Sequence, residues 1–165
     1  MHRAGLVQYR RSRLNSNVRA HMNSTFAVAY VSSAVRLLND VELEALLLDA
    51  RAFNATREVT GALLYHEGTF FQYFEGPAEA VEAVYDRVKA SRLHRGLVEL
   101  LHEQVQQRQF GSWRMGFTAA PRSLILALER ARWSKLSEQL QANAGASAGL
   151  DLLLQFWQGS QRGFA

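Results

Sequence analysis

Cysteine is missing from this 165-residue chain, which excludes disulfide bonds, thiolate metal sites and thiol catalysis. No apolar run reaches the roughly 18–20 residues that a membrane-spanning helix needs, and the sequence has no secretory signal core. A glycine-rich phosphate loop and a nucleophile motif are also missing, and His66 and His102 have no partners at metal-ligand spacing. We therefore expect a cytoplasmic protein with no membrane partner, no metal site and no enzymatic activity.

Acidic residues are missing from the first 25 positions, although the composition as a whole is that of a soluble globular protein. This segment carries five arginines, and without them the net charge of +4 becomes 14 basic against 15 acidic residues. The basic segment would suit an electrostatic arm for nucleic acid or anionic lipid, or a transit peptide. We favour a poorly ordered tail and do not expect direct nucleic-acid binding. The arginines are Arg3, Arg10, Arg11, Arg13 and Arg19.

From Phe26 onward, short β-rich runs alternate with segments of helical spacing. Strands are predicted at residues 26–32, 59–66, 69–75, 97–106 and 112–117. Asn39 and Glu42 form the capping-box pattern that begins a helix ending near Asn54, and Gly76-Pro77 is expected to end a strand and begin a second helix. The order β-α-β-β-α-β plus one strand predicts an α+β, ferredoxin-like fold with both helices on one face of an antiparallel sheet.

Beyond Pro121 the pattern predicts C-terminal helices. An apolar stripe at helical spacing runs along a third helix, a loop of small residues follows at 143–149, and residues 150–157 form a short, very apolar final helix. We expect the stripe to pack on the open sheet face, and the final helix either to dock there or to join subunits. The stripe consists of Leu124, Leu128, Leu136 and Leu140. The chain thus divides into a flexible extension at 1–25, a domain at 26–118 and a helical extension at 119–165.

A glutamine stands where an apolar residue is expected. Side chains alternate along a strand, so Phe70, Gln72 and Phe74 share one face, which the two phenylalanines mark as buried. A buried amide without partners costs about 1–3 kcal/mol. Gln72 must therefore face another polar side chain or a polar ligand.

Four further side chains are expected near Gln72. The first and third strands of a ferredoxin-like sheet are neighbours, so the Tyr30 hydroxyl would meet the Gln72 amide beneath the helices. Asn54 would reach the same cleft from its helix end, and Trp113 and Met115 are predicted to share a face of the last strand. Tyrosine can give up an electron and a proton, and amides offer paired donors and acceptors. Together these groups suit a flat redox ring.

On these residues the chain resembles the BLUF domain, a flavin-binding blue-light sensor module, from about Phe26 to Phe117. The resemblance implies that Tyr30 reduces a photoexcited flavin and that Gln72 bridges the Tyr30 hydroxyl and the N5/O4 edge of the ring. The segments that carry the resemblance are residues 30–33, 50–54, 59–65, 71–76, 92–94 and 113–115.

The same resemblance implies roles for further side chains. Asn54 would hold the pyrimidine edge of the ring, Ser32 would lie near Gln72, and His94 would lie at the far side of the ring, near the end of the second helix. Met115 would contact the cofactor and, with Trp113, would lie on the strand that passes the signal outward.

Departures from the family pattern affect the cofactor tail. Ser91 and Leu93 stand where the family often has Asp and Arg, and Phe53 stands where relatives often have a polar residue. FAD is the expected flavin, with FMN and riboflavin left open. We expect a downstream protein partner and a homo-oligomer formed through the C-terminal helices.

Two alternatives remain open at this stage. The chain would be a flavin-free ferredoxin-like adaptor if Gln72 is satisfied internally. It would be a nucleic-acid-binding protein if the basic extension carries the function.

Overall fold

A computed structural model describes residues 25–111, 113–131, 133 and 147–162. Most of the basic extension, Leu136, Leu140 and most of the predicted 143–149 loop lie outside these residues. The elements, in chain order, are β1 (Thr25–Ala34), α2 (Asp40–Ala55), β2 (Thr60–His66), β3 (Thr69–Pro77), α3 (Ala78–Ala90), β4 (His94–Val105), β5 (Gly116–Ala119), α4 (Arg122–Arg130) and α5 (Ala148–Arg162).

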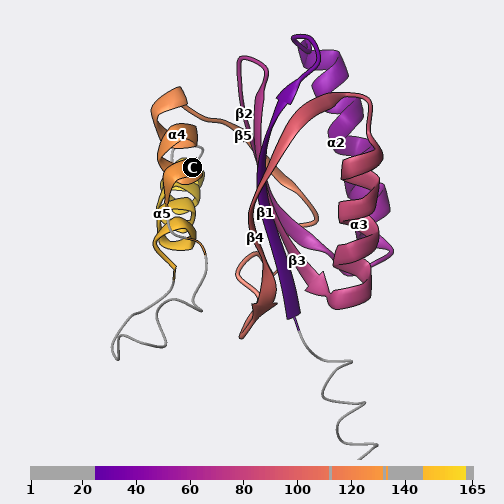
Figure 1. The fold of residues 1–165 in the computed structure, drawn as a ribbon, viewed down its shortest axis with the longest axis vertical. Coiled ribbons are helices and arrows are strands. Elements are labelled where there is room, and N and C mark those ends of the chain that lie inside the picture. Colours follow the sequence, from indigo (N-terminus) through magenta and orange to yellow (C-terminus); the bar gives the residue numbers. More distant parts are fainter. Residues whose placement is uncertain (1–24, 112, 132, 134–146, 163–165) are drawn as a thin grey trace, which may run out of the picture.

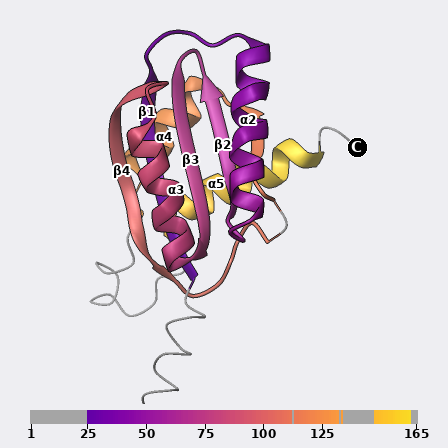
Figure 2. The same cartoon turned by 90° about the vertical axis from the view of Figure 1, so that its right-hand side faces the viewer.

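The five strands form one sheet in the order β4-β1-β3-β2-β5. β1, β3, β2 and β4 pair antiparallel, and β5 adds to the edge beside β2 in a parallel orientation. Figure 1 shows α2 and α3 on one side of the sheet and α4 and α5 on the other, and Figure 2 looks onto the first of these sides. The α+β, ferredoxin-like architecture with an added strand is therefore confirmed.

Alternation along β1 and β3 gives the sheet two apolar faces, each with its own core. Val28, Tyr30, Phe70 and Phe74 pack beneath α2 and α3. The alternate residues of both strands pack with Trp133 and the C-terminal helices on the opposite face. Both faces of the central strands are thus buried, and Gln72 lies within the face under α2 and α3.

Of the two sequence patterns that predict helix starts, the Asn39 capping box is confirmed and the Gly76-Pro77 pattern is confirmed with one change. The Asn39 side chain accepts the Glu42 amide hydrogen and the Glu42 side chain reaches back to the Asn39 amide, which is the complete capping box. β3 continues through Pro77, which pairs with Thr25. The strand therefore ends at Gly76-Pro77 as predicted but includes both residues, and Pro77 is the N-cap of α3 rather than its first helical residue.

The last strand begins later than the predicted range of 112–117. β5 starts at Gly116, and Trp113 and Met115 belong to the irregular segment before it. Hydrogen bonds from β2 and α2 fix the backbone of this segment. Gly61 N on β2 donates to Trp113 O at 2.8 Å, and Arg51 Nε on α2 donates to Met115 O at 3.0 Å. The prediction that Trp113 and Met115 share a strand face is wrong, because Met115 is buried whereas Trp113 is 43% exposed.

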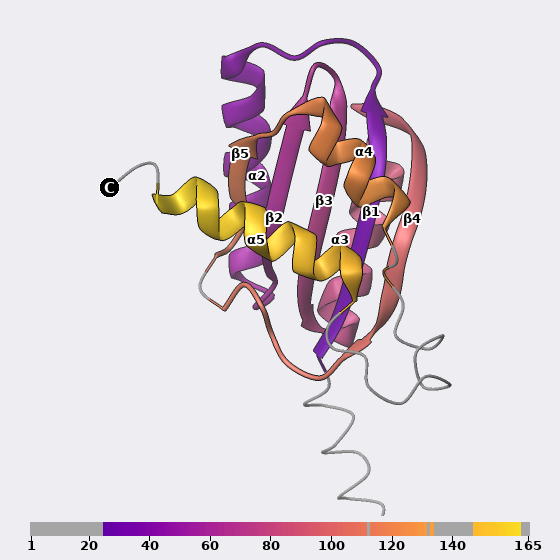
Figure 3. The ribbon, with the colours of Figure 1, turned by 90° about the vertical axis from the view of Figure 1, so that its left-hand side faces the viewer.

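The C-terminal helices cover the second face of the sheet, as Figure 3 shows. α4 ends at Arg130, where Ala131 turns extended, so the predicted third helix is shorter than its apolar stripe. α5 begins at Ala148, two residues before the predicted start. Leu153 and Trp157 of α5 are buried in the core of this face. Of the two expectations for the final helix, docking on the sheet is the arrangement present.

Candidate functional site

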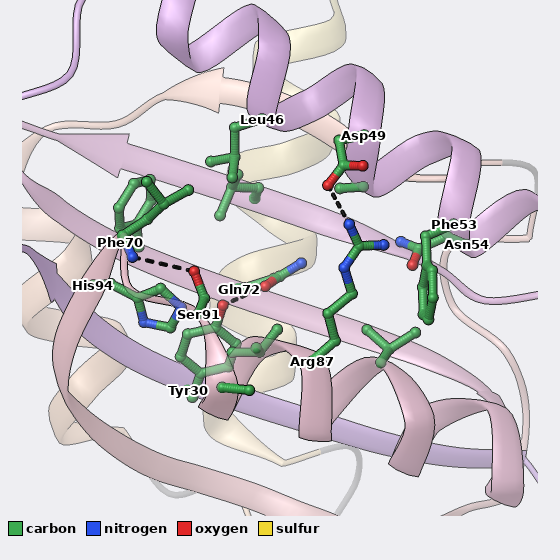
Figure 4. Close-up of a pocket in the computed structure, with 16 residues that line it drawn as sticks. Tyr30, Leu46, Asp49, Phe53, Asn54, Phe70, Gln72, Arg87, Ser91 and His94 are labelled. Carbon is green, nitrogen blue, oxygen red and sulfur yellow. Dashed lines mark hydrogen bonds and ion pairs between the residues drawn. The ribbon is translucent and has the colours of Figure 1, made fainter.

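A cavity of about 380 Å³ opens between α2, α3 and the sheet face that carries Gln72. Its volume lies in the range of small-molecule and cofactor sites. Figure 4 shows Phe70 and His94 at one end of the cavity, Phe53 and Asn54 at the other, and Tyr30 and Gln72 between them. The lining combines apolar side chains from both helices with a few polar groups, as cofactor pockets do.

Tyr30 and Gln72 face each other across paired strands, since Tyr30 of β1 is directly opposite Gln72 of β3. The Tyr30 hydroxyl donates a hydrogen bond to Gln72 Oε1, and Gln72 Nε2 donates to Met115 Sδ at 3.4 Å. Both ring and amide line the cavity. The Gln72 amide therefore has a polar side chain as its partner and is also accessible to a ligand in the cavity. Both of the possibilities that the sequence left open for Gln72 are compatible with this arrangement.

The phenol of Tyr30 is held in its protonated form. Burial raises its pKa above the ordinary value of 10, and the neighbouring Tyr85 raises it further. A protonated phenol beside an amide that offers both a donor and an acceptor can lose an electron and then a proton locally.

Asn54 is the buried last polar residue of α2. Its Nδ2 donates to the Arg114 carbonyl at 3.0 Å, and its side chain lines the cavity. Oδ1 can accept a hydrogen bond from a ligand N–H, because the oxygen is the acceptor atom of a carboxamide. Asn54 thus links the cavity to the segment that carries Met115.

His94 lines the cavity but belongs to the start of β4, four residues beyond the end of α3. Its ring stacks at 6.1 Å on Tyr30. Its Nδ1 is buried without a hydrogen-bond partner in the part of the chain that the structure describes. Burial lowers the pKa of His94, against the opposing effect of the Val88 carbonyl, so the neutral ring is favoured.

Ser32 and Met115 lie close to this site without lining the cavity. Ser32 is buried on β1, and its Oγ has no partner among the residues placed by the structure. No hydrogen bond joins Ser32 to Gln72, so its expected role near the amide stays a prediction. Met115 contacts the site through its sulfur, which accepts a hydrogen bond from Gln72 Nε2.

Trp113, Gly116 and Met115 link the cavity side of the sheet to α5. The Trp113 ring meets the Trp157 ring edge to face at 5.4 Å. Gly116 lies so close to Trp157 that a β-carbon there would stand 2.3 Å from the indole. The segment 113–116 therefore contacts Gln72 through Met115, and it contacts α5 through Trp113 and Gly116.

Sequence reasoning missed the ion pair at the cavity mouth. Arg87 of α3 pairs with Asp49 of α2, and the Arg87 guanidinium lies 4.3 Å from the Phe53 ring centroid. Arg57 covers the same ring at 3.7 Å. In the sequence, Arg87 and Asp49 both appear as ordinary charged residues on the exposed faces of two different helices. Residue spacing relates positions within one helix but not positions on two helices, so no sequence signal could have identified this pair.

These residues fit a flavin ring. The cavity is lined mainly by aromatic and aliphatic side chains, and it presents an acceptor at Asn54, an amide at Gln72 and an unpartnered ring nitrogen at His94. Within the residues described, no group of three or more His, Asp and Glu side chains is arranged to hold a metal ion. No helix among them is long and apolar enough to span a membrane.

Comparison with known proteins agrees with this chemistry. The model of the family described as BLUF, sensors of blue-light using FAD, matches residues 25–116. The chain is 32% identical over 85 residues to a photoactivated adenylate cyclase subunit beta of Euglena gracilis, a match that covers 52% of this chain and 10% of that protein. It is 36% identical over 70 residues to the blue light- and temperature-regulated antirepressor BluF of Escherichia coli (strain K12), covering 42% of this chain and 17% of that protein.

Among solved structures, the dark state of BlrB, a BLUF protein, superposes with a TM-score of 0.62 over 84% of this chain and 98% of that one, at 24% sequence identity. That likeness supports the fold. The chain spans only about a tenth of the photoactivated cyclase subunits that it matches.

Proposed function

The chain belongs to the BLUF family, because that family's model matches residues 25–116, and from this premise we propose that it is a blue-light photoreceptor that binds a flavin non-covalently. When bound, a flavin would supply an oxidant that blue light activates. Tyr30 would give up an electron to it and then pass its phenolic proton to Gln72 Oε1, which already accepts the hydrogen bond of the hydroxyl. Both return to Tyr30 after Gln72 has changed its hydrogen bonding, and the rearranged amide shifts the absorption to the red.

The observation that carries this proposal is the Tyr30–Gln72 hydrogen bond at the wall of the cavity. A buried phenol that donates to a carboxamide supplies the electron, the proton and the rearranging group within one contact. Asn54 is the proposed partner of the pyrimidine edge, and His94 is proposed to lie against the ring from the opposite end.

Signal transmission is proposed to run from Gln72 to α5. A change at the Gln72 amide alters the Nε2 contact with Met115 Sδ, and the same segment packs on Trp157 through Trp113 and Gly116. The helical extension at 119–165 would then act as the output element. A homo-oligomer through these helices stays a prediction, and Leu153 and Trp157 are used within the subunit.

The proposal extends to the kind of flavin and to the way the signal leaves the chain. We propose FAD as the flavin, with FMN and riboflavin as alternatives to be distinguished by binding. The chain would act as a sensor without a reaction of its own and would signal to a protein partner. A cytoplasmic location stays a prediction, as does the role of the basic extension.

The deciding experiment compares the full chain with Tyr30→Phe after flavin loading. The wild type should show a flavin band that shifts to the red after blue light and relaxes in the dark. Tyr30→Phe should bind flavin but form no stable red-shifted state, whereas the control Tyr65→Phe, whose hydroxyl lies near Leu38 N, should behave as wild type. A normal photocycle in Tyr30→Phe would refute the role of Tyr30. A colourless chain that takes up no added flavin would favour the adaptor alternative.

A further inference from the structure

A second buried phenol packs against Tyr30 without lining the cavity. Tyr85 of α3 packs its ring against Tyr30 at 6.3 Å between centroids, with an angle of 34° between the rings. Tyr85 does not line the cavity, whereas its neighbours Val84 and Val88 do. Tyr30 therefore lines the cavity and contacts Tyr85 as well.

The two phenols have chemically different partners. Tyr30 donates to a neutral amide oxygen, whereas Tyr85 donates to the Glu99 carboxylate at 2.8 Å. β4 places Glu99 there, because Glu99 is paired with Tyr30 across the β1–β4 ladder. A carboxylate can accept the proton that an oxidised phenol releases, whereas an amide oxygen is a far weaker base.

In the dark Tyr85 is a protonated phenol. Burial raises its pKa first, and the hydrogen bond and charge of Glu99 raise it further. Glu99 is also 3.3 Å from His102 Nδ1, so its carboxylate belongs to a polar cluster at the edge of the sheet. The Tyr85 proton is therefore already directed at its acceptor.

We propose that Tyr85, with Glu99 as its proton acceptor, is a second electron donor that competes with the Gln72 rearrangement for oxidised Tyr30. This inference rests on the proposed photoreceptor function. One electron passes from Tyr85 to the Tyr30 radical cation, which becomes a neutral phenol again with its proton in place. The O–H bond of Tyr85 breaks, an O–H bond forms on Glu99, and a neutral phenoxyl radical remains on Tyr85. The branch closes when an electron returns from the cofactor to Tyr85 and Glu99 gives back the proton.

One nearby charge opposes an electron-deficient ring at Tyr85. Lys89 Nζ lies 4.6 Å from the Tyr85 ring centroid and pairs with Asp86 at 2.9 Å. Proton transfer to Glu99 leaves the oxidised ring without net charge, so the repulsion from Lys89 acts little on the product. The consequence is a fraction of absorbed photons that return to the dark state with Gln72 unchanged.

The test uses the flavin-loaded full chain, frozen under blue light and examined by electron paramagnetic resonance for a tyrosyl radical. Wild type and the control Tyr65→Phe should trap the radical. Tyr85→Phe should lose the part of the signal that Tyr85 contributes and keep only what Tyr30 contributes, and so should Glu99→Gln, which keeps a hydrogen-bond acceptor but cannot take the proton. Both variants should form more red-shifted state per absorbed photon than wild type.

The outcomes separate this inference from the proposed function. A wild type without any red shift overturns both. A normal red shift with no trapped tyrosyl radical, or with a radical of equal size in Tyr85→Phe, overturns the role of Tyr85 alone. Glu99 is partly exposed on β4, so Glu99→Gln decides the question even if Tyr85→Phe does not fold.

Discussion

The contact between Gly116 and Trp157 makes a specific prediction for Gly116→Ala. The added methyl group would stand 2.3 Å from two carbons of the Trp157 ring. Carbon atoms in favourable contact are about 3.5–4.0 Å apart, so the overlap exceeds about 1 Å. The indole cannot simply move away, because Trp113 at 5.4 Å and Phe110 at 5.8 Å pack against it.

The expected result is destabilisation by about 1–3 kcal/mol, the usual cost of overpacking a filled core. For a chain of this size the melting temperature should fall by roughly 2–4 °C for each kcal/mol. Urea unfolding followed by tryptophan fluorescence and by circular dichroism measures the effect. Because the contact is with one ring, the same substitution in a Trp157→Phe background should cost clearly less, which a double-mutant cycle reveals.

Gly159→Ala is the matched control on α5. Among the described residues, no atom outside the local turn of α5 lies within 4 Å of the β-carbon that this substitution adds, and replacing a helical glycine with alanine should stabilise the chain by about 0.5–1 kcal/mol. The two glycine substitutions should therefore have opposite signs. If Gly116→Ala is as stable as wild type, α5 does not pack on the sheet as described, and the proposed transmission route fails with it.

Three further predictions concern the helix start, the histidine and the asparagine. Asn39→Ala removes the cap that accepts the Glu42 amide hydrogen and should cost about 1 kcal/mol in urea unfolding. Burial lowers the pKa of His94 below the ordinary value of 6.5. The stability that the neutral His94 ring contributes is therefore complete above pH 6.5 and is lost as the pH falls below 6.5, because the unfolded chain then binds the proton more readily. His94→Asn should make the urea midpoint fall less steeply below pH 6.5. Asn54→Ala leaves the Arg114 carbonyl without its donor, which should cost about 1–3 kcal/mol and weaken flavin binding in fluorescence titration.

The site was predictable where it depends on strand alternation. Phe70 and Phe74 flank Gln72 on one face, and a hairpin next to the first strand leaves Tyr30 opposite that amide. The capping box at Asn39 likewise fixed the start of α2 from local residues. These features depend on periodicity and short-range hydrogen bonds, which a single sequence carries.

The position of Trp113 and Met115 was not predictable in this way. Their alternation with Arg114 imitates a strand, yet distant groups on α2 and β2 bind the backbone of this segment. The pattern of a sequence contains no information on hydrogen bonds between residues about 50 or 60 positions apart. Gly116 was read as an ordinary strand residue for the same reason, since only its approach to Trp157 explains the absent side chain.

The buried carboxylate of Glu75 was also missed. It accepts the amide hydrogens of Gln109 at 2.6 Å and Phe110 at 2.5 Å, and the Tyr73 hydroxyl at 3.0 Å. Burial raises the pKa of Glu75, and these hydrogen bonds oppose the shift. In the sequence it reads as the polar end of a strand, because its acceptor role depends on a loop more than 30 residues away.

A visible absorption spectrum of the purified full chain, recorded before and immediately after blue light, tests directly whether Tyr30 and Gln72 form a light-driven switch. We predict a bound flavin whose band shifts slightly to the red and returns in the dark, because the Gln72 amide changes partners after Tyr30 has given up its electron. A bound flavin whose spectrum does not change under blue light would contradict it.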